Sequence, residues 1–191
     1  MKNNKTNNNA SNSKSKYSYK DLTLIALFTA IMCIVSIIQI PLPMGVPLVM
    51  QTLVVPLCGY VLGKKRGAMA IILYILIGSV GVPVFAGMRS GLEVLVGKSG
   101  GFVYGYILLA YMCGLSNSCK NIVTKYIYGI IGLVLCYALG VIQFMQVTQL
   151  SLYISILYLV VPFIVKDIIL LACALYMAKI ITKTLKSSDL L

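Results

Sequence analysis

The sequence lacks histidine and tryptophan altogether, and only four of its 191 residues are acidic. The four are Asp21, Glu93, Asp167 and Asp189. Acid–base catalysis and metal binding depend mostly on histidine and on clustered carboxylates, so this scarcity removes most catalytic and metal-binding options. We therefore expect a protein that is not an enzyme and that needs no cofactor.

Cysteine and nucleotide-binding patterns are also missing. The six cysteines show no CxxC spacing and fall mostly within apolar runs, which indicates small buried hydrophobic residues rather than a metal site or disulfides. Neither a GxxxxGK[ST] phosphate loop nor a GxGxxG fingerprint occurs. If the protein takes part in ATP-driven work, another polypeptide must hydrolyse the ATP.

Apolar residues, in contrast, are abundant. Hydrophobic residues make up 60% of the chain, charged residues make up 10%, and the mean hydropathy is +0.96. Because a soluble domain is only about half apolar, this composition predicts an integral membrane protein. The net charge of +12 comes from lysines and arginines at the ends of apolar segments, which indicates membrane topology rather than binding to nucleic acid.

Six apolar segments are candidates for transmembrane helices, and they predict an all-α fold. The first is long enough to cross a hydrocarbon core of about 30 Å. The expected helices cover residues 22–40, 49–63, 67–82, 100–115, 126–144 and 162–185. A short apolar helix is expected in an outer loop over residues 150–161. In an alternative layout the last helix starts near Leu152, which would put Lys166 and Asp167 at mid-membrane.

The chain divides into a tail and one membrane domain. Residues 1–20 are rich in Asn, Ser and Lys and cannot bury a core, so we expect a disordered tail there. Residues 21–186 then form the transmembrane domain. Of the 16 Lys and Arg residues, 13 lie in the tail, at 64–66, between the fourth and fifth helices or near the C-terminus. The positive-inside rule places these segments and both termini in the cytoplasm.

The loop between the third and fourth helices, within residues 78–106, is the most unusual stretch. It is rich in glycine and carries Arg89, Glu93 and Lys98. Irregular backbone at membrane depth persists only where protein or a water-filled cavity satisfies its amides. We therefore expect a structured outer loop that caps a binding site, with Arg89 as its main charge because a guanidinium group matches a carboxylate.

Lys166 and Asp167, near the start of the last helix, are expected on the same outer side as this loop. An ionised aspartate only accepts hydrogen bonds. Arg89 and Asp167 would therefore suit a small ligand with a carboxylate at one end and amide-like N–H groups at the other. The alternatives are an ion pair between Arg89 and Glu93, and contacts of Lys166 and Asp167 with other loops.

Four more residues are candidates for contacts. Gln51 either donates to a ligand or makes an interhelical contact. Tyr104, on the helix after the loop, either contacts the ligand or anchors the protein at the membrane interface. Ala26 and Ala30 form a small-residue face on the first helix that would let another helix approach closely, although small residues are also common in membrane helices generally.

Four blocks of sequence carry a family resemblance: IPLPMGVPLVMQTLVVPLCGYVLGKKRGAMAIILYILIG, GVPVFAG, GKSGGFVYGY and PFIVKD. In this order they resemble the BioY family, the biotin-specific substrate-binding (S) components of energy-coupling factor (ECF) transporters. The similarity covers about residues 22–180. It implies a six-helix S-component bundle that lies in the plasma membrane and binds biotin from outside.

The resemblance also implies partners and roles. The partners would be a transmembrane coupling protein, EcfT, and two ABC ATPase subunits, with Ala26 and Ala30 on the docking face. Arg89 and Asp167 match biotin-site positions of the family. Family members commonly carry a lysine three residues after the aspartate, where this chain has Leu170, and Lys166 is the candidate replacement.

Two other functions remain as alternatives. One is an S component for a different small vitamin, since the architecture is shared. The other is a membrane enzyme acting on an anionic lipid, and the absence of histidine argues against it.

Overall fold

The computed structural model describes residues 18–41 and 46–188, and most of this part of the chain is helical. The α-helices are α1 (Tyr19–Ile37), α2 (Gln51–Leu62), α3 (Lys64–Ser79), α4 (Leu92–Val96), α5 (Gly100–Leu115), α6 (Ile122–Thr148), α7 (Leu152–Leu159) and α8 (Val161–Ser187). A 3-10 helix, η1 (Ser116–Ser118), follows α5. Two-residue strands, β1 (Gln39–Ile40) and β2 (Leu48–Val49), pair antiparallel. The all-α prediction is confirmed.

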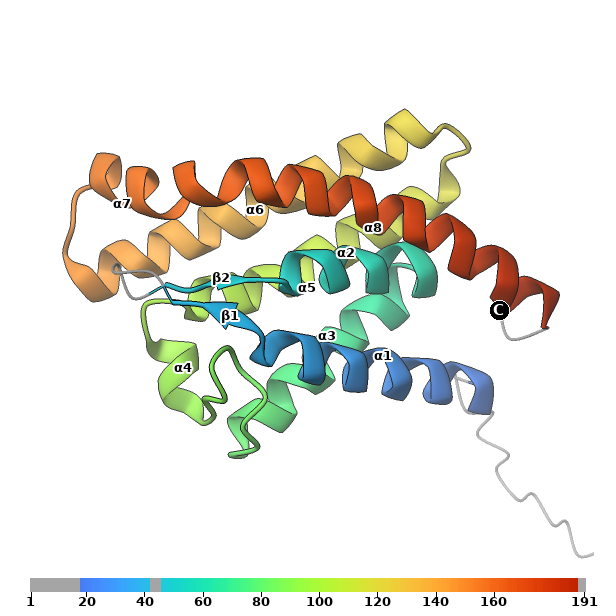
Figure 1. The fold of residues 1–191 in the computed structure, drawn as a ribbon, viewed down its shortest axis with the longest axis horizontal. Helices are drawn as coiled ribbons and strands as arrows, with labels where there is room; N and C mark the ends of the chain where they lie inside the picture. The colour runs from blue at the N-terminus through green and yellow to red at the C-terminus, as the bar shows by residue number, and fades with distance from the viewer. Residues whose placement is uncertain (1–17, 42–45, 189–191) are drawn as a thin grey trace, which may run out of the picture.

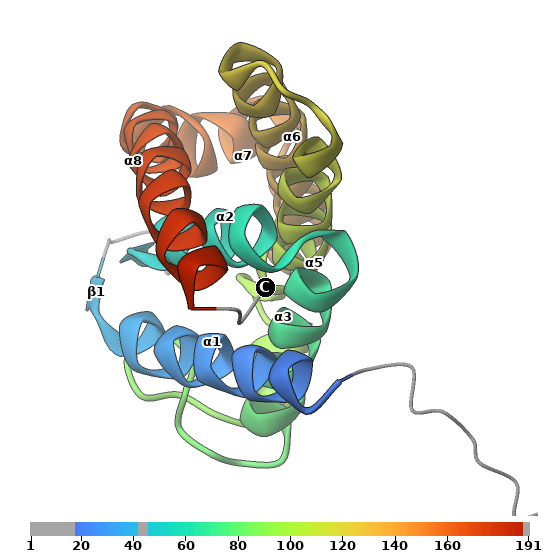
Figure 2. The ribbon, with the colours of Figure 1, turned by 90° about the vertical axis from the view of Figure 1, so that its right-hand side faces the viewer.

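The long helices are arranged in three tiers. Figures 1 and 2 show α2 and α5 in the middle, with α6 and α8 on one side and α1 and α3 on the other. The start of α1 and the end of α8 lie at one end of the bundle, which we call the terminal end. Helices α4 and α7 lie at the opposite end, which we call the loop end.

Helix α1 begins and ends earlier than the sequence predicts. The backbone N–H of Ser18 donates to Asp21 Oδ2 at 3.2 Å, so the helix starts at Tyr19 and the last two residues of the expected tail are helical. The rest of that tail, residues 1–17, lies outside the described residues. The helix ends at Ile37 because residues 39–40 pair with β2 and Pro41 cannot continue a helix.

A single residue joins α2 to α3. Gly63 adopts φ +82°, a left-handed conformation that glycine favours, and this ends α2 at Leu62. Residues 64–66 were expected to form a turn, but they form the first turn of α3. Arg66 Nη1 lies 3.1 Å from Asp21 Oδ1, an ion pair that joins α3 to α1.

Close packing of α5 on α6 depends on glycine. A Cβ atom at Gly101 would lie 2.2 Å from the carbonyl oxygen of Leu139, and one at Gly105 would lie 2.7 Å from Cys136 Sγ. Helix α6 begins earlier than expected because the side chain of Asn121 caps it by accepting from the Val123 N–H at 2.9 Å, and it also ends later, at Thr148.

The expected outer helix and the expected last helix both form. Helix α7 covers Leu152–Leu159, and α8 starts at Val161 with Pro162 in its first turn. The alternative layout, in which the last helix starts near Leu152, is wrong, since Val160 separates the two helices.

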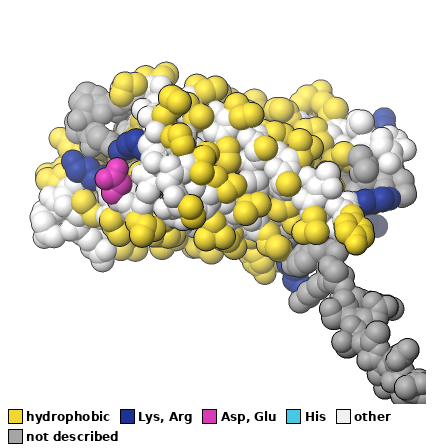
Figure 3. Space-filling view, turned by 90° about the horizontal axis from the view of Figure 1, so that it is seen from below, with side chains coloured by type: hydrophobic (Ala, Val, Ile, Leu, Met, Phe, Trp, Pro, Cys, Tyr) yellow, Lys and Arg dark blue, Asp and Glu magenta, His cyan; other side chains and the backbone are white. Residues whose placement is uncertain are grey.

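Within the described residues three helices, α1, α6 and α8, are long and apolar enough to cross a membrane. Helices α2, α3 and α5 have 12, 16 and 16 residues, so each reaches only about 18–24 Å. Six crossings were predicted, and length and composition support three of them. Figure 3 shows, on one face, hydrophobic side chains over the middle of the molecule and charged side chains toward its two ends. This distribution fits a membrane protein.

Candidate binding site

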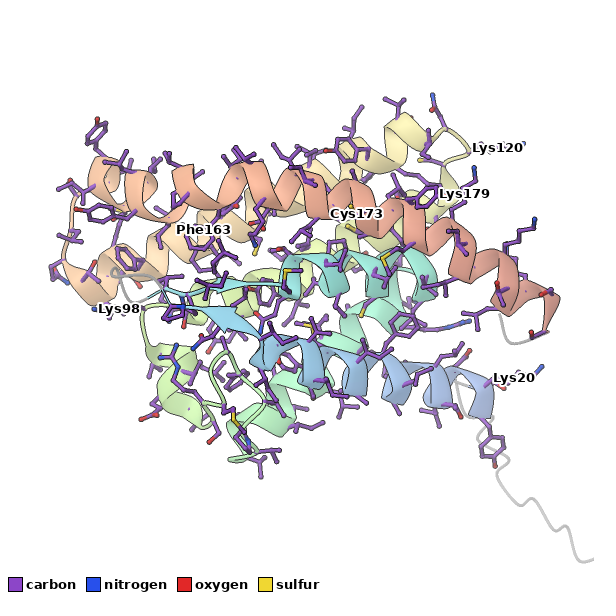
Figure 4. The ribbon with its side chains drawn as sticks, in the orientation of Figure 1. Lys20, Lys98, Lys120, Phe163, Cys173 and Lys179 are labelled. Atoms are coloured by element: carbon purple, nitrogen blue, oxygen red, sulfur yellow. The ribbon has the colours of Figure 1, made fainter. Side chains whose placement is uncertain are left out.

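A cavity at the loop end is the candidate site. It encloses about 670 Å³ of space, part of it open to solvent, and its walls come from residues 46–47, β2, α2, α3, residues 85–89, α4, α5, α6 and α8. Figure 4 shows Phe163, one of the lining residues, on the side of Lys98 and away from Lys20, Lys120 and Lys179. Gln51, Arg89, Lys166 and Asp167, which the sequence predicted as site residues, all line this cavity.

Asp167 is the centre of the polar contacts. Its side chain is buried in the second turn of α8, with 3% of the residue exposed. Thr52 Oγ1 donates to Asp167 Oδ1 at 2.6 Å, and the Tyr137 hydroxyl donates to Oδ2 at 2.5 Å. Three helices thus contribute to one carboxylate, which satisfies the requirement that a buried charge be paired and hydrogen-bonded.

Lys166 bonds the same group. Its Nζ lies 2.5 Å from Asp167 Oδ1 and donates to the Val49 carbonyl oxygen at 2.8 Å and to Thr52 Oγ1 at 3.1 Å. Although successive helical residues point about 100° apart, the long lysine side chain reaches back to its neighbour. An ammonium group has three N–H donors, and these three acceptors use all of them.

Arg89 reaches the cavity through a tight turn in the outer loop. The Phe85 N–H donates to the Arg89 carbonyl oxygen at 3.0 Å, and Gly87 and Met88 between them have φ of +71° and +60°. Arg89 Nε donates to the Ala86 carbonyl oxygen at 3.4 Å. Within the described residues no carboxylate, Glu93 included, lies at ion-pair distance from its guanidinium group, so its charge is available to a ligand.

Gln51 belongs to a buried chain of hydrogen bonds. Its Nε2 donates to the Tyr74 hydroxyl at 3.0 Å, and that hydroxyl donates to the Val84 carbonyl oxygen at 3.3 Å. The Tyr74 ring also packs edge-on against Phe85, with ring centroids 5.5 Å apart. Gln51 therefore makes the interhelical contact, and it lines the cavity as well.

The structure does not bring Tyr104 into the site, which corrects the prediction. Tyr104 is 41% exposed on the outer face of α5, whereas Tyr106 is buried and lines the cavity. Two steps of about 100° put these side chains on opposite sides of the helix. Gly101 and Gly105 did not reveal this, because they lie on the face of α5 that packs against α6.

Sequence reasoning also missed Thr52, Tyr137 and Gln143. Thr52 and Tyr137 hold Asp167. Gln143 Nε2 donates to the carbonyl oxygens of Leu95 and Gly97, at 2.7 and 2.9 Å, and so ties the end of α4 to α6. These partners lie far apart in the chain, and no local pattern marks them.

Ala26 and Ala30 do not line this cavity. Both are exposed on α1, whose buried face is formed by Leu24, Ile25, Phe28, Thr29, Met32 and Ser36. The two alanines thus lie on a face that no other helix of the described chain covers.

Comparisons with known proteins all point to one family. The model of the BioY family matches residues 5–187. The biotin transporter BioY of Thermotoga maritima is 39% identical over 161 residues, which cover 83% of this chain and 94% of that protein. The probable biotin transporter BioY of Pyrococcus horikoshii is 32% identical, over 84% of this chain and 94% of that protein.

A solved structure shows the same fold. A crystal structure of the S-component for biotin from an ECF-type ABC transporter matches with a TM-score of 0.79 and 23% identity, covering 86% of this chain and 91% of that one. The family match spans nearly the whole chain and two relatives exceed 30% identity. The chain therefore belongs to the BioY family.

Proposed function

We propose that this protein takes up biotin across the plasma membrane, as the substrate-binding S component of an ECF-type transporter. The observation that carries the proposal is family membership together with relatives, named as biotin transporters, that align over 94% of their length. The polar and apolar groups of the loop-end cavity fit this ligand class. The relatives are named as transporters, in keeping with a protein that is not an enzyme.

Biotin carries a carboxylate on a flexible chain and a ureido group with N–H donors on a bicyclic ring. In our proposal Arg89 binds the carboxylate, since its guanidinium group has no acidic partner among the described residues. Asp167 accepts from a ureido N–H, because its Oδ2 accepts from Tyr137 alone and a carboxylate oxygen has room for a second bond. Apolar walls, such as Phe85, Val94 and Phe102, enclose the ring and chain.

Lys166 has a supporting role in this proposal. Its three donors are taken by Asp167, Val49 and Thr52, so it fixes the carboxylate of Asp167 and does not contact biotin. Leu170, at the position where the family resemblance implies a lysine, supplies no second cation, and Arg89 is left as the principal partner of the biotin carboxylate. Gln51 contributes through its contact with Tyr74.

We infer an orientation with the loop end outside. Six helical segments, α1, α2, α3, α5, α6 and α8, would cross the membrane, with α4 and α7 in outer loops. Both termini are then cytoplasmic, with the lysines of the terminal end on the same side, as the positive-inside rule favours. The residues 21–186 act as one membrane domain in this arrangement.

Transport requires further subunits in our proposal. A coupling protein of the EcfT type and two ABC ATPases would supply the energy, since the chain has no nucleotide-binding motif. The exposed face around Ala26 and Ala30 is the proposed docking surface, where small side chains allow close helix approach.

The proposal is tested by exchanging the Arg89 guanidinium group for a neutral amide. Arg89→Gln should weaken biotin binding by about 10–100-fold, because a hydrogen-bonded charge pair is worth about 1.5–3 kcal/mol. Lys98→Gln, which removes a charge from the same outer loop without touching the cavity, is the matched control. Filter binding of labelled biotin to both variants measures the effect, and equal affinities would refute the assigned site.

A further inference from the structure

A second hollow opens at the terminal end, far from the biotin cavity. It holds about 1980 Å³ of space, including open solvent. Its walls come from the junction of α2 and α3, from η1 and the start of α6, and from the last turns of α8. The floor is held by two hydrogen bonds: the Tyr60 hydroxyl donates to the Lys125 carbonyl oxygen at 3.1 Å, and Asn117 Nδ2 donates to the Tyr60 carbonyl oxygen at 3.0 Å. We call it the basic groove.

Cations converge on the basic groove from all of these segments. Its lining includes Lys64, Lys65, Arg66, Lys120, Lys125, Lys179, Lys183 and Lys186, and no acidic residue. Arg66 is paired with Asp21. Across the described parts of the chain, no carboxylate lies at ion-pair distance from any of the seven lysines. Figure 4 shows Lys120 and Lys179 at this end. The uncompensated charge calls for an anion.

The inner part of the basic groove is apolar. Val61, Leu62, Leu175 and Ala178 line it and are buried. Along α8 the lining passes from Leu175 to Lys179 and Lys183, four residues apart each time and therefore on one face. From Leu175 to Lys186 the helix runs about 16 Å. The groove thus combines an apolar interior with a cationic mouth. Over this distance of about 16 Å it can hold a lipid headgroup and part of an acyl chain.

The neighbouring surface is suited to the membrane. On α8, beside the groove, Tyr176 and Ile180 are 67% and 52% exposed, as expected for side chains that face lipid. A soluble anion would meet only the cationic mouth and would leave the apolar interior unused. A lipid with a charged headgroup would use both parts.

We propose that the basic groove binds an anionic phospholipid of the cytoplasmic leaflet, with the phosphate at the lysines and an acyl chain against Val61, Leu175 and Ala178. Basic pockets between transmembrane helices on the cytoplasmic side are suited to such headgroups. The positive-inside rule alone explains basic residues on this side, but it does not require that they surround one hollow with an apolar interior. The inference does not depend on the identity of the transported substrate.

The test compares lipid binding by the full-length protein and two variants, each lacking two lysines. Lys179→Gln/Lys183→Gln changes the groove. Lys20→Gln/Lys98→Gln removes the same charge outside its lining and is the control. Native mass spectrometry from neutral detergent, after addition of dioleoylphosphatidylglycerol or dioleoylphosphatidylcholine, measures the bound lipid. Thermal unfolding of both variants checks that they remain folded.

We expect the wild type and the control to retain phosphatidylglycerol at least about tenfold better than phosphatidylcholine, and the groove variant to lose this preference. Unchanged retention of phosphatidylglycerol by the groove variant would overturn the proposal. Equally tight binding of glycerol phosphate, which has no acyl chain, would reassign the groove to a soluble anion. A groove variant that keeps the lipid but no longer co-purifies with its transporter subunits would reassign it to a protein partner.

Discussion

The carboxylate of Asp167 shows how this chain keeps a charge buried inside the helical bundle. Three side chains from three helices, Thr52, Tyr137 and Lys166, all contact it. Burying an unpaired carboxylate would cost several kcal/mol, and a buried ion pair is stable only when hydrogen bonds complete it. The cluster therefore provides a charged acceptor of fixed position in the cavity wall.

The contribution of one of these contacts can be measured. Tyr137→Phe removes the hydroxyl that donates to Asp167 Oδ2 and keeps the ring, which packs edge-on against Phe102 with centroids 6.1 Å apart. A hydrogen bond to a charged group is worth about 1.5–3 kcal/mol, so biotin affinity should fall by about 10–100-fold.

The control for this change is Tyr176→Phe, at a tyrosine that is 67% exposed on α8. Radiolabelled biotin binding to both variants gives the comparison. An affinity of Tyr137→Phe within about twofold of the wild type would mean that the hydroxyl does not position Asp167 for the ligand.

For single residues, the sequence was enough to identify the charged side chains of the site but not the side chains that bond to them. Arg89, Lys166 and Asp167 stood out because charged residues are rare in so apolar a chain. Thr52 could not be found, since its partner Asp167 lies 115 positions away. Tyr104 was predicted as a site residue and Tyr106 was not, because composition says which residues are present, and only the helical phase decides which of them faces the cavity.

At the scale of helices, α4 depends on a contact from α6, which lies far from it in the sequence but next to it in space. With five residues it has few hydrogen bonds of its own, and Gln143 of α6 binds the carbonyl oxygens at its end. Val94 of α4 lies in the cavity wall. We infer that Gln143 keeps this wall in place.

Gln143→Leu tests this inference. The change removes the bonds from Gln143 to the Leu95 and Gly97 carbonyl oxygens, at about 1 kcal/mol for each lost bond, and the Gly97 oxygen keeps its bond from the Gly100 N–H. Biotin affinity should fall by about 5–30-fold, mainly through faster dissociation. Stopped-flow displacement of a fluorescent biotin derivative measures the rate. The same rate in Gln143→Leu and in the exposed control Gln146→Leu would show that α4 needs no such anchor.

Helix α1 provides the second prediction at this scale. Ala26→Leu with Ala30→Leu places large side chains on the exposed face of α1, where a partner helix would have to approach closely. Biotin uptake by cells that also express the coupling subunits should fall strongly, while binding to the purified protein stays unchanged. Ala138→Leu, at an exposed position of α6, is the control. Normal uptake by the double variant would rule out this face as the docking surface.

Helix positions were predictable from the sequence to within a few residues, because charges, prolines and glycines mark the ends of apolar segments. The observed helix ends differ from the predicted ones where a local contact determines the residue at which a helix begins or ends. Residues 64–66 joined α3 because Gly63 alone makes the turn, and residues 39–40 left the first helix because β2 pairs with them. Neither of these two boundary shifts can be predicted from the hydropathy of the sequence.

For the molecule as a whole, the charged groups are divided between its two ends. The loop end holds a cavity with one buried carboxylate and a free guanidinium group, and the terminal end holds lysines without acidic partners among the described residues. Hydrophobic side chains cover the middle of the face shown in Figure 3. This polarity agrees with the proposed orientation, in which the loop end receives the ligand outside and the terminal end faces the cytoplasm.

The central claim, that the loop-end cavity binds biotin, is tested most directly by isothermal titration of the detergent-purified, full-length protein with biotin. The account predicts saturable heat with one biotin per chain, and competition by biotin analogues that keep the ureido ring and the carboxylate. A titration without heat, together with no displacement of labelled ligand by biotin, would contradict it.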